Sequence, residues 1–241
     1  MKYTVKDDNN IPTLMKSLKQ LNGSTIKVGV PDGHMADIAA VHEFGATITA
    51  NKKYLAIPLQ RKYKGRSPKE FNDLFFVPSK SGDGGTLCKA KGKGKKATVE
   101  ACYWLTKSVK IPERSFLRAC VDEKQKDFYK FAEKQLDKWL QSNSDPEPML
   151  DALGLQFRGY VQKYIRDLSS PPNAPLTKAV KRSGNPLIDQ GHLVGSIEYE
   201  IKCGDLVWNH DPFYFLFHCN PFMPFTSLRI KKALRLRKPC K

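Results

Sequence analysis

The apolar residues near the start of the chain first recur every three or four positions and then alternate. The first pattern predicts a short amphipathic helix whose apolar side is formed by Ile11, Leu14, Leu18 and Leu21. The segment STIKVGVP follows, and in it apolar residues alternate with polar residues or glycine at Ile26, Val28 and Val30. This alternation predicts a half-buried strand.

The segment MADIAAVHEF returns to the helical period. Its apolar positions share one helical side, at Met35, Ile38 and Val41. Gly45 follows directly after the segment, and a glycine at that place is a common helix stop. We therefore expect a second short helix that ends at Gly45.

Residues 51–108 have a different pattern, with short strand-like runs separated by glycine-rich and lysine-rich stretches. The runs are YLAIPL, LFFVP, TLCKA and ACYWLTKSV, and the separators are SKSGDGG and KAKGKGKKAT. Glycine supplies the positive φ that turns need, and lysine keeps loop tips solvated. The pattern predicts a projecting β-hairpin insertion. The separator is not a phosphate-binding loop, because Lys93 precedes Gly94 and the flanking runs resemble strands.

Two long helical patterns follow the insertion. The first opens after IPERSF and extends to about Ser142, with an apolar stripe at Leu117, Val121, Phe128, Phe131, Leu136 and Leu140. The second starts at Asp145 and Pro146, with a stripe at Leu150, Leu153, Phe157, Val161, Ile165 and Leu168. We expect these two helices to carry most of the core.

The segment after the second helix, SSPPNAPLTKAVKRSGNPLIDQG, has the composition of a loop. Apolar residues nevertheless recur in it, at Leu176, Val180, Leu187 and Ile188, and they favour a functional contact loop. SIEYEI then alternates, with Ile197, Tyr199 and Ile201 on one side and the glutamates on the other, which predicts a second half-buried strand. The aromatic and proline-rich stretch VWNHDPFYFLFHCNPFMPF has neither a strand pattern nor a helix pattern.

These elements predict an α+β fold in which a small antiparallel sheet packs with two long amphipathic helices and carries the projecting hairpin. We expect one domain over residues 1–205, including the insertion at 51–108. Residues 206–241 form an aromatic and basic extension for which the pattern gives no fold.

The net charge of +17 is concentrated in two segments. Residues 52–96 contribute 13 basic against three acidic residues, and the last 13 residues contribute seven basic residues and no acid. Five lysines of the insertion are candidates for contact with DNA or a partner, namely Lys89, Lys91, Lys93, Lys95 and Lys96. Two interpretations remain open: weak, sequence-independent phosphate contact, or a solvated tip that keeps the hairpin soluble.

The sequence contains no recognisable catalytic or metal-binding set. The six cysteines are scattered without a CxxC pair, and no second histidine follows His42 and Glu43 at zinc-protease spacing. No nucleophile elbow of the GxSxG type occurs. We therefore expect no enzyme activity and no cofactor. No apolar run approaches the roughly 20 residues of a membrane span, and the start lacks a signal peptide, so we expect a soluble cytosolic protein.

Several short motifs follow one another in a fixed order between about residues 23 and 201. They are VGVPDG, AAVHEFG, KIPERSFLR, PPNAPLT and NPLIDQGHLVGSIEYEI. The series resembles the virion morphogenesis proteins of bacteriophages, a family of tail-completion or neck components. The insertion at 51–108 enlarges what is often a short connection in that family, and the stretch after Cys203 has no counterpart in it.

The resemblance implies a noncatalytic structural protein of the virion neck, assembled in the host bacterial cytoplasm, that joins the head connector to the tail. Its implied partners are copies of itself in a ring, the head connector or adaptor, the tail tube or terminator, and nonspecifically the packaged double-stranded DNA. The alternative is a sequence-independent nucleic-acid-binding protein that uses basic segments 52–96 and 229–241.

The resemblance also implies structural roles for the motif residues, which are His42, Glu43, Phe44, Gly45, Pro112, Arg114, Phe116, Leu187, Ile188, Asp189 and Gly191. From the residues themselves, Pro112 would preset φ for a helix start and Phe116 would pack under a loop. Leu187 and Ile188 would enter the core, and Asp189 would cap the turn that contains Gly191.

Overall fold

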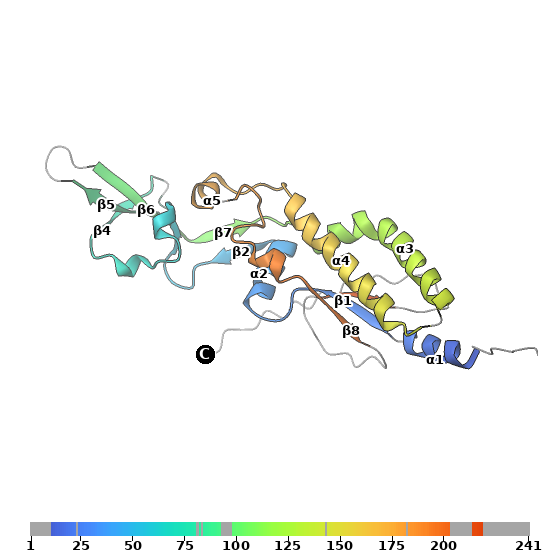
Figure 1. Cartoon of the computed structure of the whole chain (residues 1–241). Helices are drawn as coiled ribbons and strands as arrows, with labels where there is room; N and C mark the ends of the chain where they lie inside the picture. Colours follow the sequence, from blue (N-terminus) through green and yellow to red (C-terminus); the bar gives the residue numbers. More distant parts are fainter. Residues whose placement is uncertain are drawn as a thin grey trace, which may run out of the picture. The chain divides into compact units, whose positions relative to one another are not determined.

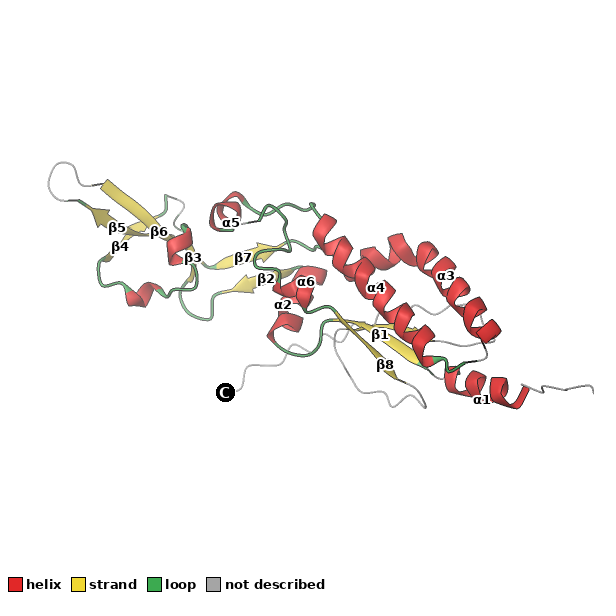
Figure 2. Cartoon of the chain, in the orientation of Figure 1, coloured by secondary structure: helices red, strands yellow, loops and turns green. Residues whose placement is uncertain are grey.

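The chain has an α+β fold in a computed structural model, and two compact units make it up (Figures 1 and 2). Unit 1 is Met1–Ala39, Ser115–Ile165 and Leu193–Lys241, and unit 2 is Ala40–Arg114 and Arg166–His192. The structure describes residues 11–22, 24–80, 82, 84–92, 98–142, 144–181, 183–202 and, for the backbone only, 214–218.

The sheet of unit 1 has three antiparallel strands. β1 (Thr25–Gly29) lies between β8 (Glu198–Lys202) and β9 (Tyr214–His218). The predicted strand is present, but the prediction that it is half-buried is wrong, because all five residues of β1 are buried in the central strand of the sheet. β9 comes from the segment in which the sequence pattern predicted no strand.

The strand β8 alternates as predicted. Glu198 and Glu200 are exposed, whereas Tyr199 is half-buried and Ile197, which precedes the strand, is fully buried. The predicted first helix is α1 (Ile11–Leu21), in which Leu21 is buried, whereas Ile11 of the predicted apolar side is 67% exposed.

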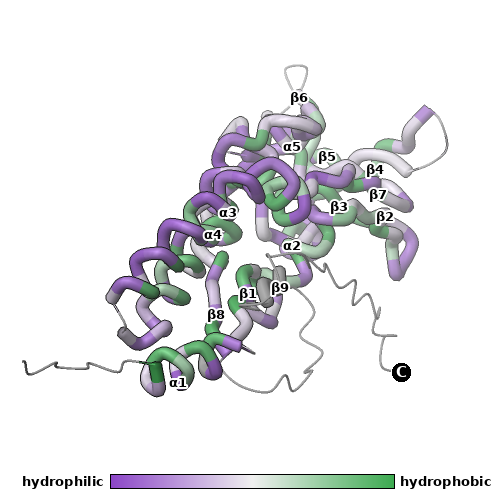
Figure 3. Tube along the Cα trace, turned by 90° about the vertical axis from the view of Figure 1, so that its right-hand side faces the viewer, coloured by the Kyte–Doolittle hydropathy of each residue, from purple (hydrophilic) through white to green (hydrophobic). Residues whose placement is uncertain are grey.

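The two long helices of unit 1 are α3 (Leu117–Ser142) and α4 (Glu147–Asp167), which run side by side in two views (Figures 1 and 3). Polar residues, purple in Figure 3, follow much of their visible side. Helix α4 begins directly after the predicted start at Asp145 and Pro146, and Oδ1 of Asp145 accepts the N–H of Glu147 at 3.1 Å. The rings of Phe128 and Phe157 meet edge to face with centroids 5.2 Å apart.

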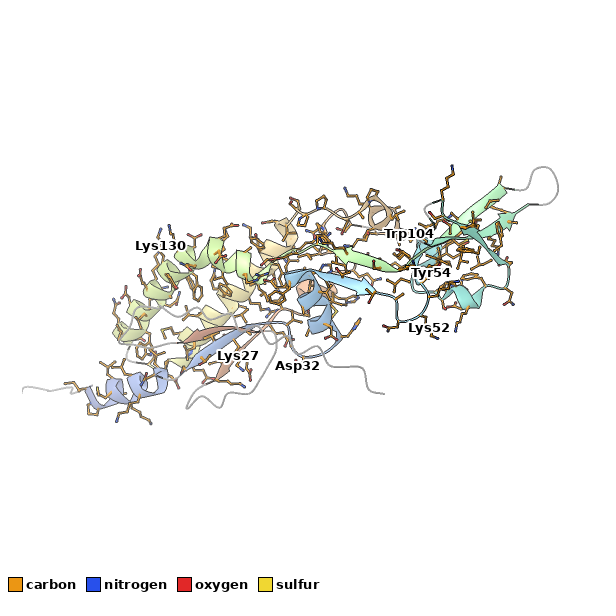
Figure 4. All side chains as sticks on the ribbon, turned by 180° about the vertical axis from the view of Figure 1, so that it is seen from behind. Lys27, Asp32, Lys52, Tyr54, Trp104 and Lys130 are labelled. Carbon is orange, nitrogen blue, oxygen red and sulfur yellow. The ribbon has the colours of Figure 1, made fainter. Side chains whose placement is uncertain are left out.

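The stripe of α4 is confirmed from Leu150 to Ile165, but the stripe of α3 is partly wrong at its end. Leu140 is 45% exposed, whereas Trp139 is 4% exposed. The indole of Trp139 donates from Nε1 to the carbonyl of Ser144 at 2.9 Å, so the larger apolar side chain is buried with its polar atom satisfied. Figure 4 labels Lys130 on the exposed side of the same helix.

Helix α4 packs closely against β8. A Cβ added at Gly154 would overlap the ring of Tyr199, and the hydroxyl of Tyr199 donates to Asp151 at 2.6 Å. Gly154 is therefore a contact residue, and its lack of a side chain lets the tyrosine ring lie on the helix.

The helix α2 (His34–Phe44) ends as predicted at Gly45, which has a φ of +68°. Its buried side differs from the predicted one. Ala36, Ala39 and Glu43 are buried, whereas the predicted residues Met35, Ile38 and Val41 are only half-buried. Small alanines allow close packing of the helix, which a pattern of large apolar residues does not reveal.

Unit 2 contains two sheets. β2 (Ala46–Thr49) pairs with β7 (Ser108–Ile111), and a four-stranded antiparallel sheet has the order β3 (Leu55–Pro58), β6 (Thr98–Thr106), β5 (Gly85–Lys91), β4 (Leu74–Pro78). Short 3-10 turns lie at Arg61–Tyr63 and Pro68–Glu70. α5 (Pro175–Val180) also lies here, and α6 (His192–Gly195) begins at its last residue.

The insertion is thus a four-stranded sheet, in which β5 and β6 form one hairpin, and the run ACYWLTKSV divides into two strands at Lys107. It has its own small core of Tyr63, Cys102 and Tyr103, with Phe71, Leu74 and Leu87 against it. The ring centroids of Tyr63 and Tyr103 are 5.3 Å apart. Figure 4 labels Lys52 and Tyr54 on the connection into β3 and Trp104 on the adjacent β6.

None of the described helices is long and apolar enough to span a membrane.

Candidate functional site

The sequence motifs meet at one place in unit 2, although they are far apart in the chain. The backbone N–H of Arg114 donates to the carbonyl of His42 at 2.7 Å. A Cβ added at Gly45 would lie 2.9 Å from the amide nitrogen of Glu113, closer than side chains normally approach a backbone. Position 45, where the motif with His42 meets the backbone of the motif with Arg114, therefore requires glycine. The backbone has a positive φ there, and no space is left for a Cβ.

The guanidinium of Arg114 ties these motifs to a third. Arg114 is 5% exposed, and its Nε donates to the carbonyl of Pro171 at 2.8 Å. Its Nη2 donates to the carbonyl of Pro172 at 3.2 Å and to Oδ1 of Asn173 at 3.4 Å. Burial lowers the pKa of Arg114. The planar fork of an arginine can satisfy three oxygens at once, and here it holds the PPN loop.

Asn185 organises the fourth motif, NPLID. Its Oδ1 accepts the N–H groups of Leu187 at 2.8 Å and Ile188 at 3.0 Å. Its Nδ2 donates to the carbonyls of Arg166 at 2.9 Å and Leu168 at 3.0 Å, near the C-terminal end of α4. One side-chain amide thus closes a turn and satisfies helix-end carbonyls.

The imidazole of His42 lies in a cationic and partly dry environment. Burial is the main cause that lowers its pKa to about 4, and the charges of Arg114 and Lys181 contribute. The ring is therefore neutral at pH 7. Its Nδ1 is buried without a hydrogen-bond partner. In a catalytic triad an orienting carboxylate would hold this kind of nitrogen, so the geometry of His42 does not resemble a general base.

The remaining motif residues are placed as follows. Helix α3 begins at Leu117, so Pro112 lies outside its first turn and the predicted helix-start role is wrong. Leu187 is 6% exposed, so its predicted entry into the core is confirmed, whereas Ile188 is only half-buried and the same prediction is wrong for it. Phe116 and Glu43 are buried, and Phe44 and Asp189 are half-buried.

Asp189 of the NPLID motif lies beside the basic insertion. Asp189 forms an ion pair with Lys64 on the insertion. Gly191 has a φ of +86° and open space around its Cα. The proposed capping role of Asp189 stays a prediction.

The candidate lysines of the insertion do not share one loop. Lys89 and Lys91 belong to β5, which corrects their predicted position in the glycine-rich loop, and Lys93, Lys95 and Lys96 lie outside the described residues. Lys89 pairs with Asp73 at 2.5 Å. Both lysines lie in a strand because β5 extends one residue beyond the run TLCKA, to Lys91.

Four cations that the sequence analysis did not single out lie beside Lys89 and Lys91, namely Arg61, Lys62, Lys64 and Arg66. We call these four, together with Lys89 and Lys91, the basic patch. Four members of the patch line a pocket of about 340 Å³ together with Tyr63, Phe71 and Glu100. Three line a pocket of about 760 Å³ that includes Asp189, and Lys62 lines both. The dense run RKYKGR was the available signal, because its cations flank an aromatic residue.

Acidic side chains partly neutralise the basic patch. Lys62 pairs with Glu100, Arg66 with Glu70, Lys64 with Asp189 and Lys89 with Asp73. The hydrogen bond from Lys62 is the main cause that lowers the pKa of Glu100, and the one from Lys89 does the same for Asp73. These carboxylates therefore stay ionised at neutral pH.

Two other features of the patch favour an anionic ligand with flat groups. The guanidinium of Arg66 lies 4.4 Å from the ring centroid of Phe71, and Nζ of Lys62 lies 5.0 Å from that of Tyr63. Unit 2 as a whole has 20 basic and eight acidic residues, a net charge of +12. The patch therefore lies in a positive field even though most of its members are paired.

Among the described residues, no cluster of histidine, cysteine, aspartate and glutamate side chains could hold a metal ion. Comparison of the chain with protein-family models, curated proteins and solved structures finds no match.

Proposed function

We propose that the chain is a noncatalytic structural subunit of the bacteriophage neck, which joins the head connector to the tail during assembly. The observation that carries the proposal is the junction at Arg114. The motifs that give the resemblance to virion morphogenesis proteins are bonded to one another there, although they lie far apart in the sequence. The order of the motifs in the sequence and their meeting at one point in the fold together support a single structural unit.

The polar atoms at this junction are used to hold backbone segments together. Arg114 binds carbonyls of the PPN loop, and Asn185 binds both its own turn and the carbonyls of Arg166 and Leu168. Such a junction gives a rigid base for surface loops and sheet edges, which are the contact surfaces of an assembly protein. Its proposed partners are further copies of the chain, the head connector and the tail.

The test is a complementation assay with particles from cells in which the gene has been deleted. The proposal expects DNA-filled heads and finished tails that remain separate, and joining when purified protein is added. The variant Arg114→Gln should restore joining poorly, whereas Arg61→Gln, an exposed arginine of the same unit, should restore it well. Normal joined particles from the deletion strain would overturn the proposal.

A second candidate function is sequence-independent contact with DNA, and the basic patch favours it. Cations and aromatic rings lie together there in a unit of net charge +12. The side chains of the basic patch do not form the rigid base-reading geometry that sequence specificity requires. Any binding to DNA should therefore depend on phosphate contacts and not on the base sequence.

The dependence of DNA affinity on salt tests this candidate. Each phosphate contact contributes a slope of about −0.9 to log K against log salt. The double variant Arg61→Gln, Lys91→Gln should therefore flatten the slope by up to about 1.8. A charge-matched control, Lys69→Gln with Lys178→Gln, changes exposed lysines outside the patch. If both double variants flattened the salt slope equally, DNA affinity would depend on the net charge of the chain and not on the basic patch.

A further inference from the structure

The strand β4 is an edge strand with no charged residue, and Pro78 at its end is its device against pairing. It lies at the end of the order β3-β6-β5-β4, and no strand pairs with its outer side in the part of the chain that the structure describes. Its sequence, LFFVP, carries no charge. Phe75, Phe76 and Val77 are 41%, 47% and 41% exposed. Natural edge strands usually carry a lysine, a bulge or another device that prevents pairing.

The exposed side chains of β4 belong to both faces of the sheet. Phe76 is in register with Leu87 of β5, on the face that carries the aromatic core. Phe75 and Val77 are in register with Cys88 and Thr86 and therefore lie on the opposite face. A partner that covered one face of the sheet would leave the exposed side chains of the other face in water. A strand added at the edge of β4 contacts Phe76 on one face and Phe75 and Val77 on the other.

The backbone of β4 offers hydrogen-bonding groups at this edge. Ser79 donates its N–H to the carbonyl of Gly84 at 3.0 Å, so Val77 and Phe75, two and four residues earlier, also point their backbone groups toward β5. Leu74, Phe76 and Pro78 consequently point toward the free edge. Pro78 has a carbonyl but no N–H, so it can accept a bond there and cannot donate one.

We propose that β4 pairs antiparallel with β4 of a second copy of this chain, with a two-fold axis at Phe76. In this register the two Phe76 residues exchange N–H···O=C bonds, and each Leu74 donates to Pro78 of the second copy. Phe75 lies opposite Val77 of the second copy on the other face, which is a favourable cross-strand pair. Self-complementarity of this kind is what a two-fold contact requires.

Charge at the strand ends also suits a second copy. Asp73 precedes β4 and Lys80 follows it, and both are exposed. Antiparallel pairing brings Asp73 of one chain beside Lys80 of the other, at both ends of the contact. A parallel arrangement would bring like charges together, which opposes it. The inference goes beyond the proposed function, because a two-fold contact closes a pair and does not by itself build a ring.

Sedimentation equilibrium of the full chain tests the pairing. A contact of this small size predicts reversible dimers with a dissociation constant of roughly 10–100 µM. Phe76→Lys places two like charges at the axis and should weaken the dimer at least tenfold. Val99→Lys is the control, since Val99 is 65% exposed on β6 and lies away from the edge formed by β4. A monomeric wild-type chain at 200 µM, or equal weakening by both variants, would overturn the proposal.

Two further measurements separate this contact from other kinds of association. The dimer should persist in 1 M salt, whereas copies bridged by nucleic acid would separate there. Phe76→Cys should form a disulfide-linked dimer under mild oxidation well above the background of the native cysteines, and Val99→Cys should not. Dissociation at high salt, or similar cross-linking of the two cysteine variants, would contradict strand pairing. Circular dichroism of each variant confirms that it is folded.

Discussion

The backbone N–H of Arg114 donates to the carbonyl of His42 at 2.7 Å, and this bond joins the end of a helix to the segment that leads out of β7. The bond is possible because Gly45 turns the chain at a φ of +68° directly against Glu113. The motif that contains His42 and Glu43 therefore has a visible structural purpose.

Substitution of Gly45 should be costly for two separate reasons. Gly45→Ala places a Cβ 2.9 Å from the amide nitrogen of Glu113 and also forces alanine to a positive φ. Gly65 has a φ of +76° with open space around it, so Gly65→Ala isolates the second effect. We expect losses in unfolding free energy of about 3 kcal/mol for Gly45→Ala and about 1 kcal/mol for Gly65→Ala, measured by urea unfolding. Equal losses would mean that the close approach to Glu113 is unimportant.

Replacement of Arg114 by lysine tests the role of the guanidinium fork. Lysine keeps the charge, but its single ammonium cannot reach the carbonyls of Pro171 and Pro172 in the same planar arrangement. We expect a loss of about 2 kcal/mol and faster hydrogen exchange around Asn173. Arg61→Lys is the matched control in the same unit and should change neither quantity. Unchanged exchange near Asn173 in Arg114→Lys would contradict the assigned contacts.

The pKa of His42 predicts a dependence of stability on pH. The folded pKa is about 4, below the ordinary 6.5, so the unfolded chain binds a proton first as the pH falls. The stability from the neutral ring is complete above pH 6.5 and is lost progressively between 6.5 and 4. We expect His42→Leu to remove about 1 kcal/mol of the destabilisation between pH 6.5 and 5, because the ring is only partly buried.

The control for this titration is the exposed histidine of the same unit, in the variant His192→Leu. Urea unfolding of the three proteins at pH 7, 6 and 5 gives the comparison. Parallel pH profiles for wild type and His42→Leu would show that His42 does not contribute to the acid sensitivity.

Two glycines of helix α4 should respond to alanine with opposite signs. Gly159 has open space, and Gly159→Ala should stabilise the chain by about 0.5–1 kcal/mol through helix propensity. The Cβ that Gly154→Ala adds would overlap the ring of Tyr199, so this variant should destabilise the chain by about 2 kcal/mol. Thermal unfolding measures both. If Gly154→Ala stabilised the chain instead, the ring of Tyr199 would not lie against α4 at this position.

Strongly periodic segments of the sequence were sufficient to predict the long helices and most strands. Leu150 to Ile165 kept the helical period and are buried as expected, because burial of a continuous stripe dominates the position of a helix. The predicted buried side of α2 is wrong, since Ala36 and Ala39 are buried and the weak hydropathy of alanine does not distinguish a buried position from an exposed one. The periodicity of one segment does not show which other element packs against a helix face.

The contacts at the site could not be predicted in the same way. Arg114 and Asn173 are far apart in the chain, and only the fold brings the guanidinium to the PPN loop. The arrangement of the basic patch is not predictable from the run RKYKGR, because only the folded sheet brings Tyr63 and Phe71, and with them the run, beside β5. Lys89 and Lys91 were placed in a loop because glycines follow them, but β5 continues through both.

The most direct test of the proposed neck function is an electron cryomicroscopy reconstruction of the neck in purified particles, combined with mass spectrometry of the same particles. The account predicts that the chain is present and that several symmetry-related copies of α3, α4 and the three-stranded sheet fit the density between head connector and tail. Particles that lack the chain, with neck density fully explained by other proteins, would contradict it.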